Sequence, residues 1–187
     1  MIFRPKMPFA LLLASFMLIA SLISLSTFSN PPSAQANYHA DSSINTRNNE
    51  GNTPLNVATK RADVEAVRSL VRSGADPNVR DNEGNTPLNV AAKRANFQIL
   101  SLLLQAGADP NVRDNEGNTP LNVACKRNNN SMASRLLQSG ADATVRDNQG
   151  NTPLMVVQKW YNRSLNYRSL TNSRSLIQAL KNAGASE

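Results

Sequence analysis

The sequence repeats itself every 33 residues, and this period constrains the fold more than any other feature. The tetrapeptide Asn-Thr-Pro-Leu begins at Asn52, Asn85, Asn118 and Asn151. A second motif, Gly-Ala-Asp, keeps the same register at Gly74, Gly107 and Gly140. A fixed period of this length indicates one structural unit per copy, and such units bury their apolar faces against neighbouring copies. The repeated part is therefore expected to fold as a stack of similar units.

Each copy predicts two short helices. In the second copy, Thr86 can cap a helix with its hydroxyl, and Pro87 suits the first helical position because its missing N–H costs nothing there. This helix is expected to end around Lys93 and Arg94. A more apolar second helix is expected over residues 97–104, and the glycine of the Gly-Ala-Asp motif then ends it.

Together these motifs resemble the ankyrin-repeat family, whose 33-residue repeat carries a Thr-Pro-Leu-His-x-Ala motif and folds as a turn followed by two helices. The resemblance covers about residues 47–187. It implies an all-α solenoid of four helix-turn-helix repeats with finger turns, at residues 47–79, 80–112, 113–145 and 146–187. Residues 37–46, which precede the first repeat, are polar and are expected to form a flexible tail.

Two positions depart from the family pattern. The histidine after Thr-Pro-Leu is replaced by asparagine in three copies and by Met155 in the fourth. Asparagine is still expected to hydrogen-bond between repeats. The glycine between the two helices is replaced by Ala62, Ala95 and Asn128. Because alanine pays a steric cost at positive φ, some stability is expected to be lost in these turns.

The fourth copy is 11 residues longer than the period. We place this insertion between the two helices, at residues 161–173, and predict a final helix over residues 174–183. Lys181 stands where the third copy has Leu137. A charged residue there suits a terminal repeat, whose outer face must tolerate water.

The first 36 residues carry the pattern of an export signal. Arg4 and Lys6 precede an uncharged apolar run over residues 8–25. The small residues Ala34 and Ala36 then offer a signal-peptidase site, so we expect cleavage after Ala36 and a secreted or periplasmic product. An uncleaved membrane anchor is the alternative, because the run approaches the roughly 20 residues that span a bilayer.

The composition offers little for catalysis. The chain holds one histidine, His39, in the expected tail, and one cysteine, Cys125, which is expected to be a buried thiol. A histidine-based triad, a multi-histidine metal site and an internal disulfide are therefore excluded. The recurrent Arg-Asp-Asn-Glu-Gly motif lacks the alternating acids of a calcium loop. We predict no enzyme activity, no metal and no cofactor.

In the proteins that this chain resembles, partners bind in a concave groove formed by the finger turns and the exposed ends of the first helices. The matching positions of this sequence are Asn82, Glu83, Asn85, Lys93, Arg94 and Arg113. A basic row is expected from three Lys-Arg pairs at the same spacing, Lys60-Arg61, Lys93-Arg94 and Lys126-Arg127. The row continues in the fourth copy as Lys159-Trp160, and beside it would run Glu50, Glu83 and Glu116. The alternative interpretation is that these charges only keep the solenoid soluble.

After removal of residues 1–36, the chain carries 18 basic and 13 acidic residues, a net charge of +5. In an exported protein, this favours an acidic protein face or another anionic surface as partner over nucleic acid. A membrane association is expected only if the N-terminal segment remains as an anchor. The leading prediction is an exported protein-binding module. The alternatives are an accessory or inhibitory protein for an exported enzyme and a polyanion binder at the cell envelope.

Overall fold

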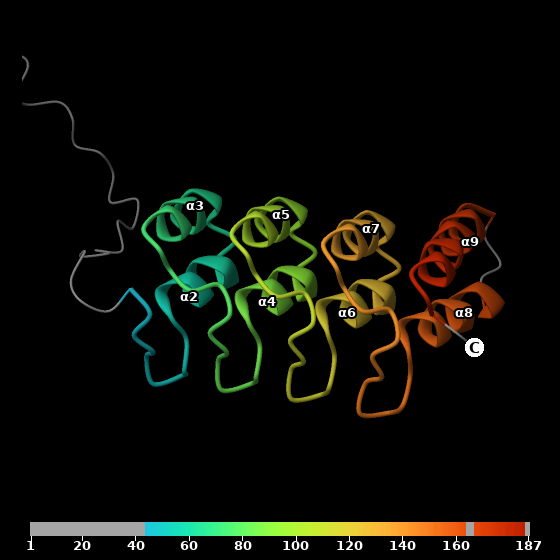
Figure 1. Ribbon diagram of the computed structural model, residues 1–187, viewed down its shortest axis with the longest axis horizontal. Coiled ribbons are helices and arrows are strands. Elements are labelled where there is room, and N and C mark those ends of the chain that lie inside the picture. Colours follow the sequence, from blue (N-terminus) through green and yellow to red (C-terminus); the bar gives the residue numbers. More distant parts are fainter. Residues whose placement is uncertain (1–43, 164–166, 186–187) are drawn as a thin grey trace, which may run out of the picture. The chain divides into compact units, whose positions relative to one another are not determined.

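A computed structural model describes residues 44–163 and 167–185, and within these ranges the chain is a helical solenoid without strands (Figure 1). Its helices are α2 (Pro54–Lys60), α3 (Val64–Arg72), α4 (Pro87–Lys93), α5 (Phe97–Gln105), α6 (Pro120–Lys126), α7 (Asn130–Gln138), α8 (Pro153–Arg163) and α9 (Tyr167–Asn182). The all-α fold and the pairing of helices within each repeat are as the sequence predicts. The proposed signal peptide, its cleavage site and His39 lie outside the described residues.

The helices form two layers (Figure 1). The first helices of the repeats, α2, α4, α6 and α8, each pack against the first helix of the next repeat, and the second helices, α3, α5, α7 and α9, do the same. The four finger turns, around residues 47–52, 80–85, 113–118 and 146–151, precede the first helices and extend beyond their layer (Figure 1). The exposed ends of the first helices therefore lie next to the bases of the fingers.

Threonine and proline start the first helices as predicted. The hydroxyl of Thr86 accepts a hydrogen bond from the backbone N–H of Asn89, and Pro87 occupies the first helical position. The same arrangement recurs at Thr53 and Thr119. Second helices are capped by Asp63, Asn96 and Asn129, whose side chains accept from the backbone N–H three residues later. Each cap typically contributes about 1 kcal/mol, because it satisfies an otherwise unpaired donor.

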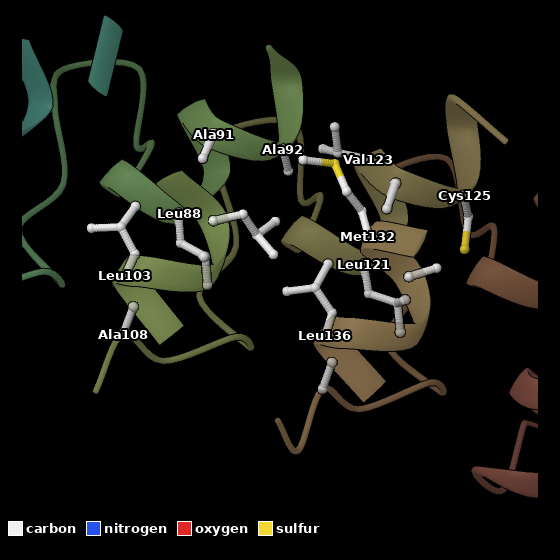
Figure 2. Packing of buried hydrophobic residues seen from close by; sticks show 14 of the residues in the cluster. Leu88, Ala91, Ala92, Leu103, Ala108, Leu121, Val123, Cys125, Met132 and Leu136 are labelled. Atoms are coloured by element: carbon white, nitrogen blue, oxygen red, sulfur yellow. The ribbon is translucent and has the colours of Figure 1, made fainter. Parts of the chain in front are cut away.

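One continuous apolar core runs through the stack. The leucine of each Asn-Thr-Pro-Leu motif is fully buried, as are leucines of the second helices. Figure 2 shows Leu88 and Leu103 of one repeat, and Leu121 and Leu136 of the next, directed into this interior. Each such leucine contributes about 1.5–3 kcal/mol by leaving water. Because a repeat shares this core with its neighbours, the stack folds as a unit.

The turns between the helices have the strained geometry that the sequence predicts. Ala62, Ala95 and Asn128 have φ values of 58°, 55° and 51°. These are left-handed values, which glycine adopts freely and alanine does not. The replacement of the family's glycine by alanine therefore leaves strain in two of the four repeats.

The fourth repeat accommodates its insertion differently from our prediction of an extra segment between the helices. α8 has 11 residues where the other first helices have 7, and α9 has 16 where the other second helices have 9. These extensions of four and seven residues account for all 11 inserted residues. The final helix thus begins at Tyr167 rather than Arg174, because α8 and α9 lengthen together as a packed pair.

Two residues of the expected tail, Ile44 and Asn45, contact the solenoid. The side chain of Ile44 is partly buried against the core, and the Asn45 side chain accepts a hydrogen bond of 2.9 Å from the Asp76 backbone N–H. Asn78 and Asn111, which lie one and two periods later in the sequence, accept the same bond from the backbone N–H groups of Asp109 and Asp142. Ile44 and Asn45 are therefore packed on the solenoid, because Ile44 contacts its core and Asn45 makes the same bond as Asn78 and Asn111.

Candidate functional site

The lysines at the ends of the first helices tie neighbouring repeats together. The ammonium groups of Lys60, Lys93 and Lys126 each lie 3.0 Å from a carboxylate of the next finger, on Asp81, Asp114 and Asp147. Each of these aspartate side chains is 1 % exposed, and the lysines are about one-third exposed. These three lysines of the predicted basic row are thus paired with aspartates within the solenoid.

The buried carboxylate at the base of each finger also orders the turn. Asp81 accepts hydrogen bonds from the backbone N–H groups of Glu83 and Asn85, at 3.0 and 2.8 Å. Burial raises the pKa of Asp81, but the bonds from Asn85 and Lys60 and the lysine's charge outweigh it and hold the pKa below its usual value. The pKa of Asp147 is lowered by the same balance of burial and bonds. Both aspartates are therefore ionised partners of their lysines at neutral pH.

In the first finger, an uncharged side chain takes the place of the buried aspartate. This finger has Asn48 at the position of the aspartates, and the Asn48 side chain accepts the equivalent bonds from Glu50 and Asn52 at 3.0 and 2.9 Å. No lysine of the described chain precedes this finger. A neutral amide keeps the turn without burying a charge that would lack a counter-ion.

The arginines that follow the lysines are free. Arg61, Arg94 and Arg127, the C-terminal caps of α2, α4 and α6, are exposed. Within the described ranges their side chains make no hydrogen bond or ion pair. We call these three residues the arginine row. Of the predicted Lys-Arg pairs, the arginines are therefore the members available to a partner.

The finger residues predicted to bind a partner divide between the surface and the interior. Asn82 and Glu83 are exposed, whereas Asn85 is 2 % exposed and its amide donates to Glu83 at 3.0 Å. The guanidinium of Arg113 donates to the Gly117 carbonyl at 3.1 Å and to the Arg146 carbonyl of the next finger at 3.0 Å. Asn85 and Arg113 hold the finger turns, which is a structural use that the sequence pattern did not reveal.

Asparagine at the family's histidine position links one repeat to the next. In Asn89, the side-chain oxygen accepts from the Thr86 backbone N–H and hydroxyl, at 3.2 and 2.6 Å. Its amide donates to the Val112 carbonyl at 3.2 Å and to the Asn118 carbonyl of the following repeat at 3.3 Å. The expected hydrogen bond between repeats is thus present at Asn89.

In the fourth repeat, the positions equivalent to the paired lysines and to the arginine row are Lys159 and Trp160. Lys159 is exposed and, within the described residues, has no carboxylate partner. Trp160 is 47 % exposed and stands where the earlier repeats have the arginine row. Trp160 is therefore not enclosed beneath the lengthened helices, and half of its side chain remains on the surface.

Groups suited to catalysis or metal binding do not gather in the described part of the chain. No set of three or more histidine, cysteine or acidic side chains there is placed to hold a metal ion. Cys125 is fully buried on the side of α6 toward the fourth repeat (Figure 2), and burial raises the pKa of its thiol far above the usual range. A thiol in this state is a poor nucleophile. None of the helices within the described ranges is long and apolar enough to cross a membrane.

The aspartate partners of the lysines are the residues that sequence reasoning missed. The sequence carried a sign of them, because Lys and Asp recur together every 33 residues and the first copy alone has asparagine instead. In sequence, these aspartates have the pattern of turn residues, whose side chains commonly bond to the backbone nearby. Their second role became visible when the repeats were stacked, because each lysine pairs with the finger of the following repeat.

Comparison with known proteins agrees with this architecture. A family described as "Ankyrin repeats (3 copies)" matches residues 22–114, and one described as "Ankyrin repeats (many copies)" matches residues 103–156. A search of curated proteins found no match. The 33-residue period, the paired helices and the finger turns fit both family matches. The chain belongs to the ankyrin-repeat family.

Proposed function

We propose that this chain is a non-catalytic module that binds a partner protein on its finger face. By finger face we mean the arginine row together with the exposed finger residues Asn82 and Glu83. Ankyrin repeats generally serve protein–protein interaction. The observation that carries the proposal is the arginine row. Its three equivalent guanidinium groups are exposed and have no partner among the residues that the structure describes, while the adjacent lysines are paired.

Arginine is well suited to this role. Its planar guanidinium binds carboxylates through two parallel hydrogen bonds, and it is enriched among residues that dominate binding energy at interfaces. Equivalent positions in adjacent repeats are separated by about 10 Å, the usual distance between packed helices. The arginine row therefore suits an extended acidic surface of a partner protein better than a single small ligand.

The fingers offer this face on a rigid frame. The backbone N–H groups of Asn82, Asn115 and Asn148 donate to carbonyls of the preceding finger, at 3.4, 3.2 and 3.1 Å. The side-chain amides of the same asparagines donate to the preceding finger at 3.4, 3.2 and 3.0 Å. A surface already ordered in this way loses less conformational entropy on binding, which favours affinity.

We further propose that the module acts outside the cytoplasm, as a secreted or periplasmic protein. The support is the N-terminal sequence, in which a basic flank, an apolar run and Ala34-Gln35-Ala36 follow in the order of a cleavable signal. Mass measurement of the exported protein is the test. A chain beginning at Asn37 is expected, and a full-length chain extracted from the membrane would show an anchor instead.

The binding proposal is tested by two matched triple variants. In one, Arg61, Arg94 and Arg127 become glutamine, and in the other, the second-helix residues Arg68, Arg72 and Arg135 do. The partner is first isolated with the natural chain from the envelope fraction of its own source, and its Kd for each purified variant is then measured. We expect the arginine-row variant to bind at least tenfold more weakly and the control less than twofold. Equal affinity of all three proteins would refute the finger face as the binding site.

A further inference from the structure

A pocket of about 280 Å³ opens at the C-terminal end of the arginine row. It lies between the fourth finger, the side chain of Lys126 on α6 and one side of α8. The residues of its lining that matter here are Lys126, Gln149, Met155, Val156, Lys159 and Trp160. We call this site the end pocket.

Three substitutions relative to the earlier repeats meet in the end pocket, together with one lysine that has no carboxylate partner among the described residues. Gln149 replaces the glutamates of the first three fingers, and Met155 replaces the asparagines that hydrogen-bond to carbonyls. Trp160 replaces an arginine. Lys159 is the equivalent of the paired lysines but has no carboxylate beside it within the described residues. One acidic group is thus lost and two apolar side chains are added at the same place.

The charge in the end pocket is positive. Its lining residues include two lysines and no acid, and one of the lysines, Lys126, is paired at 3.0 Å with the Asp147 carboxylate, which is 1 % exposed. Lys126 also donates to the Asn118 side chain at 2.7 Å, so its ammonium group is largely occupied. The ammonium group of Lys159 remains, and no acidic side chain in the described part of the chain pairs with it. This group can therefore attract a carboxylate from outside the chain.

The end pocket also has an apolar part, which is formed by Trp160, Met155 and Val156. Among the side chains that the structure describes, Trp160 and Phe97 are the large apolar ones left exposed, and Trp160 lines the end pocket whereas Phe97 does not. Met155 and Val156 are partly buried beside Trp160. Tryptophan next to such a recess is a typical anchor of a binding interface, because it offers a large rigid surface at small entropic cost.

We propose that the end pocket binds an acidic segment of the partner protein, with a carboxylate at Lys159 and an adjacent apolar side chain against Trp160 and Met155. This inference rests on the proposed function and names the partner's chemistry at one end of the finger face. A volume of about 280 Å³ lies at the lower limit for small-molecule sites and suits one side chain of a longer peptide. The arginine row ends next to the end pocket, because its last member, Arg127, directly follows the pocket residue Lys126 in the chain.

The experiment selects peptides and then locates their binding. A phage-displayed library of random 12-residue peptides is selected on the full chain after removal of phage that bind the Trp160→Ala variant. We expect the selected peptides to contain Asp or Glu beside Leu, Ile or Phe. Because Trp160 is the chain's only tryptophan, its fluorescence should shift to shorter wavelength when such a peptide covers it.

Variants make the assignment specific. With a fluorescently labelled selected peptide, anisotropy should show at least tenfold weaker binding to Lys159→Gln and to Trp160→Ala. Phe97→Ala and Arg72→Gln, which change an aromatic residue and a cation exposed on second helices, should bind as the natural chain does. Circular dichroism confirms that each variant remains folded.

Three results would refute the proposal that the end pocket binds an acidic segment. They are that no peptide is enriched, that the enriched peptides are basic, or that binding is insensitive to both pocket variants. These results differ from failure of the proposed function. A partner whose binding requires the arginine row but not Lys159 or Trp160 would refute binding at the end pocket and would still support binding at the finger face.

Discussion

At the scale of single residues, Ala95 occupies a backbone conformation that glycine would adopt at less cost. Its φ is 55°, and its side chain is exposed, so removing the methyl group opens no cavity. Relief of left-handed strain, reduced by the greater entropy of glycine in the unfolded chain, should make Ala95→Gly more stable by about 0.5–1 kcal/mol. Urea unfolding of the purified protein measures this difference.

The matched control for Ala95→Gly is Ala92→Gly, three residues earlier. Ala92 is fully buried within α4, where glycine lowers helix stability by about 1 kcal/mol and leaves a gap as well. The two variants should therefore change stability in opposite directions. If Ala95→Gly is also destabilising, the positive φ of this turn is not a source of strain.

Lys93 and Arg94 are adjacent in sequence and have different roles. Lys93→Ala removes the partner of the buried Asp114 carboxylate, and since the lysine is partly exposed we expect a loss of about 1–2 kcal/mol. Arg94→Ala should change stability by no more than about 0.5 kcal/mol, because the side chain is exposed and unpaired in the described structure. Thermal unfolding of both variants decides this, and equal losses would contradict the division of roles.

This difference corrects an expectation from sequence. The periodic Lys-Arg pairs predict correctly that both residues lie at the end of a first helix, but they suggest that both are solvated. The ion pair of Lys93 joins residues 21 positions apart on different repeats. Helical periodicity places residues within one element, whereas such a contact depends on how two repeats stack.

At the scale of elements, the fit between consecutive fingers sets a requirement for glycine. A Cβ on Gly84 would lie 2.9 Å from the Asn115 backbone nitrogen and would collide with the Asn115 side chain. A Cβ on Gly150, in the last finger, would meet no atom within 4 Å. Their φ values, 76° and 80°, are nearly equal, so the pair separates backbone strain from contact between fingers.

We therefore expect Gly150→Ala to cost about 1 kcal/mol, from the positive φ alone. Gly84→Ala should cost about 1–3 kcal/mol more, because the added methyl group forces neighbouring fingers apart. Chemical denaturation of the two variants gives the comparison. Similar losses would mean that the fingers separate without cost and do not form a rigid frame.

The sequence predicts the short helices well and the long ones poorly. Threonine and proline mark the starts of α2, α4 and α6, and glycine follows the ends of α3, α5 and α7, because caps and turns are determined by local chemistry. α8 and α9 extend through a segment rich in Ser, Asn and Arg, residues that also favour turns and helix ends. Their lengthening depends on packing of one helix against the other, which local preference does not encode.

At the scale of the whole molecule, near-identical interfaces should allow one repeat to be removed. Deletion of residues 80–112 would bring Asp114 to Lys60 in place of Asp81, and the first-helix leucines would meet in the same register. Because each repeat contacts only its neighbours, the shortened chain should fold with a lower free energy of unfolding. Circular dichroism during thermal unfolding measures both properties, and complete loss of helix at low temperature would contradict the solenoid of equivalent units.

The central claim is that a partner protein binds the finger face, and site-specific photo-crosslinking in cells of the natural source tests it most directly. A photoreactive amino acid is introduced in place of Arg94 and, as a control, in place of Gln98, which is exposed on α5 in the layer of second helices. The account predicts a crosslink to one partner protein from position 94, its repetition from positions 61 and 127, and none from position 98. Crosslinks from position 98 without any from the arginine row would contradict it.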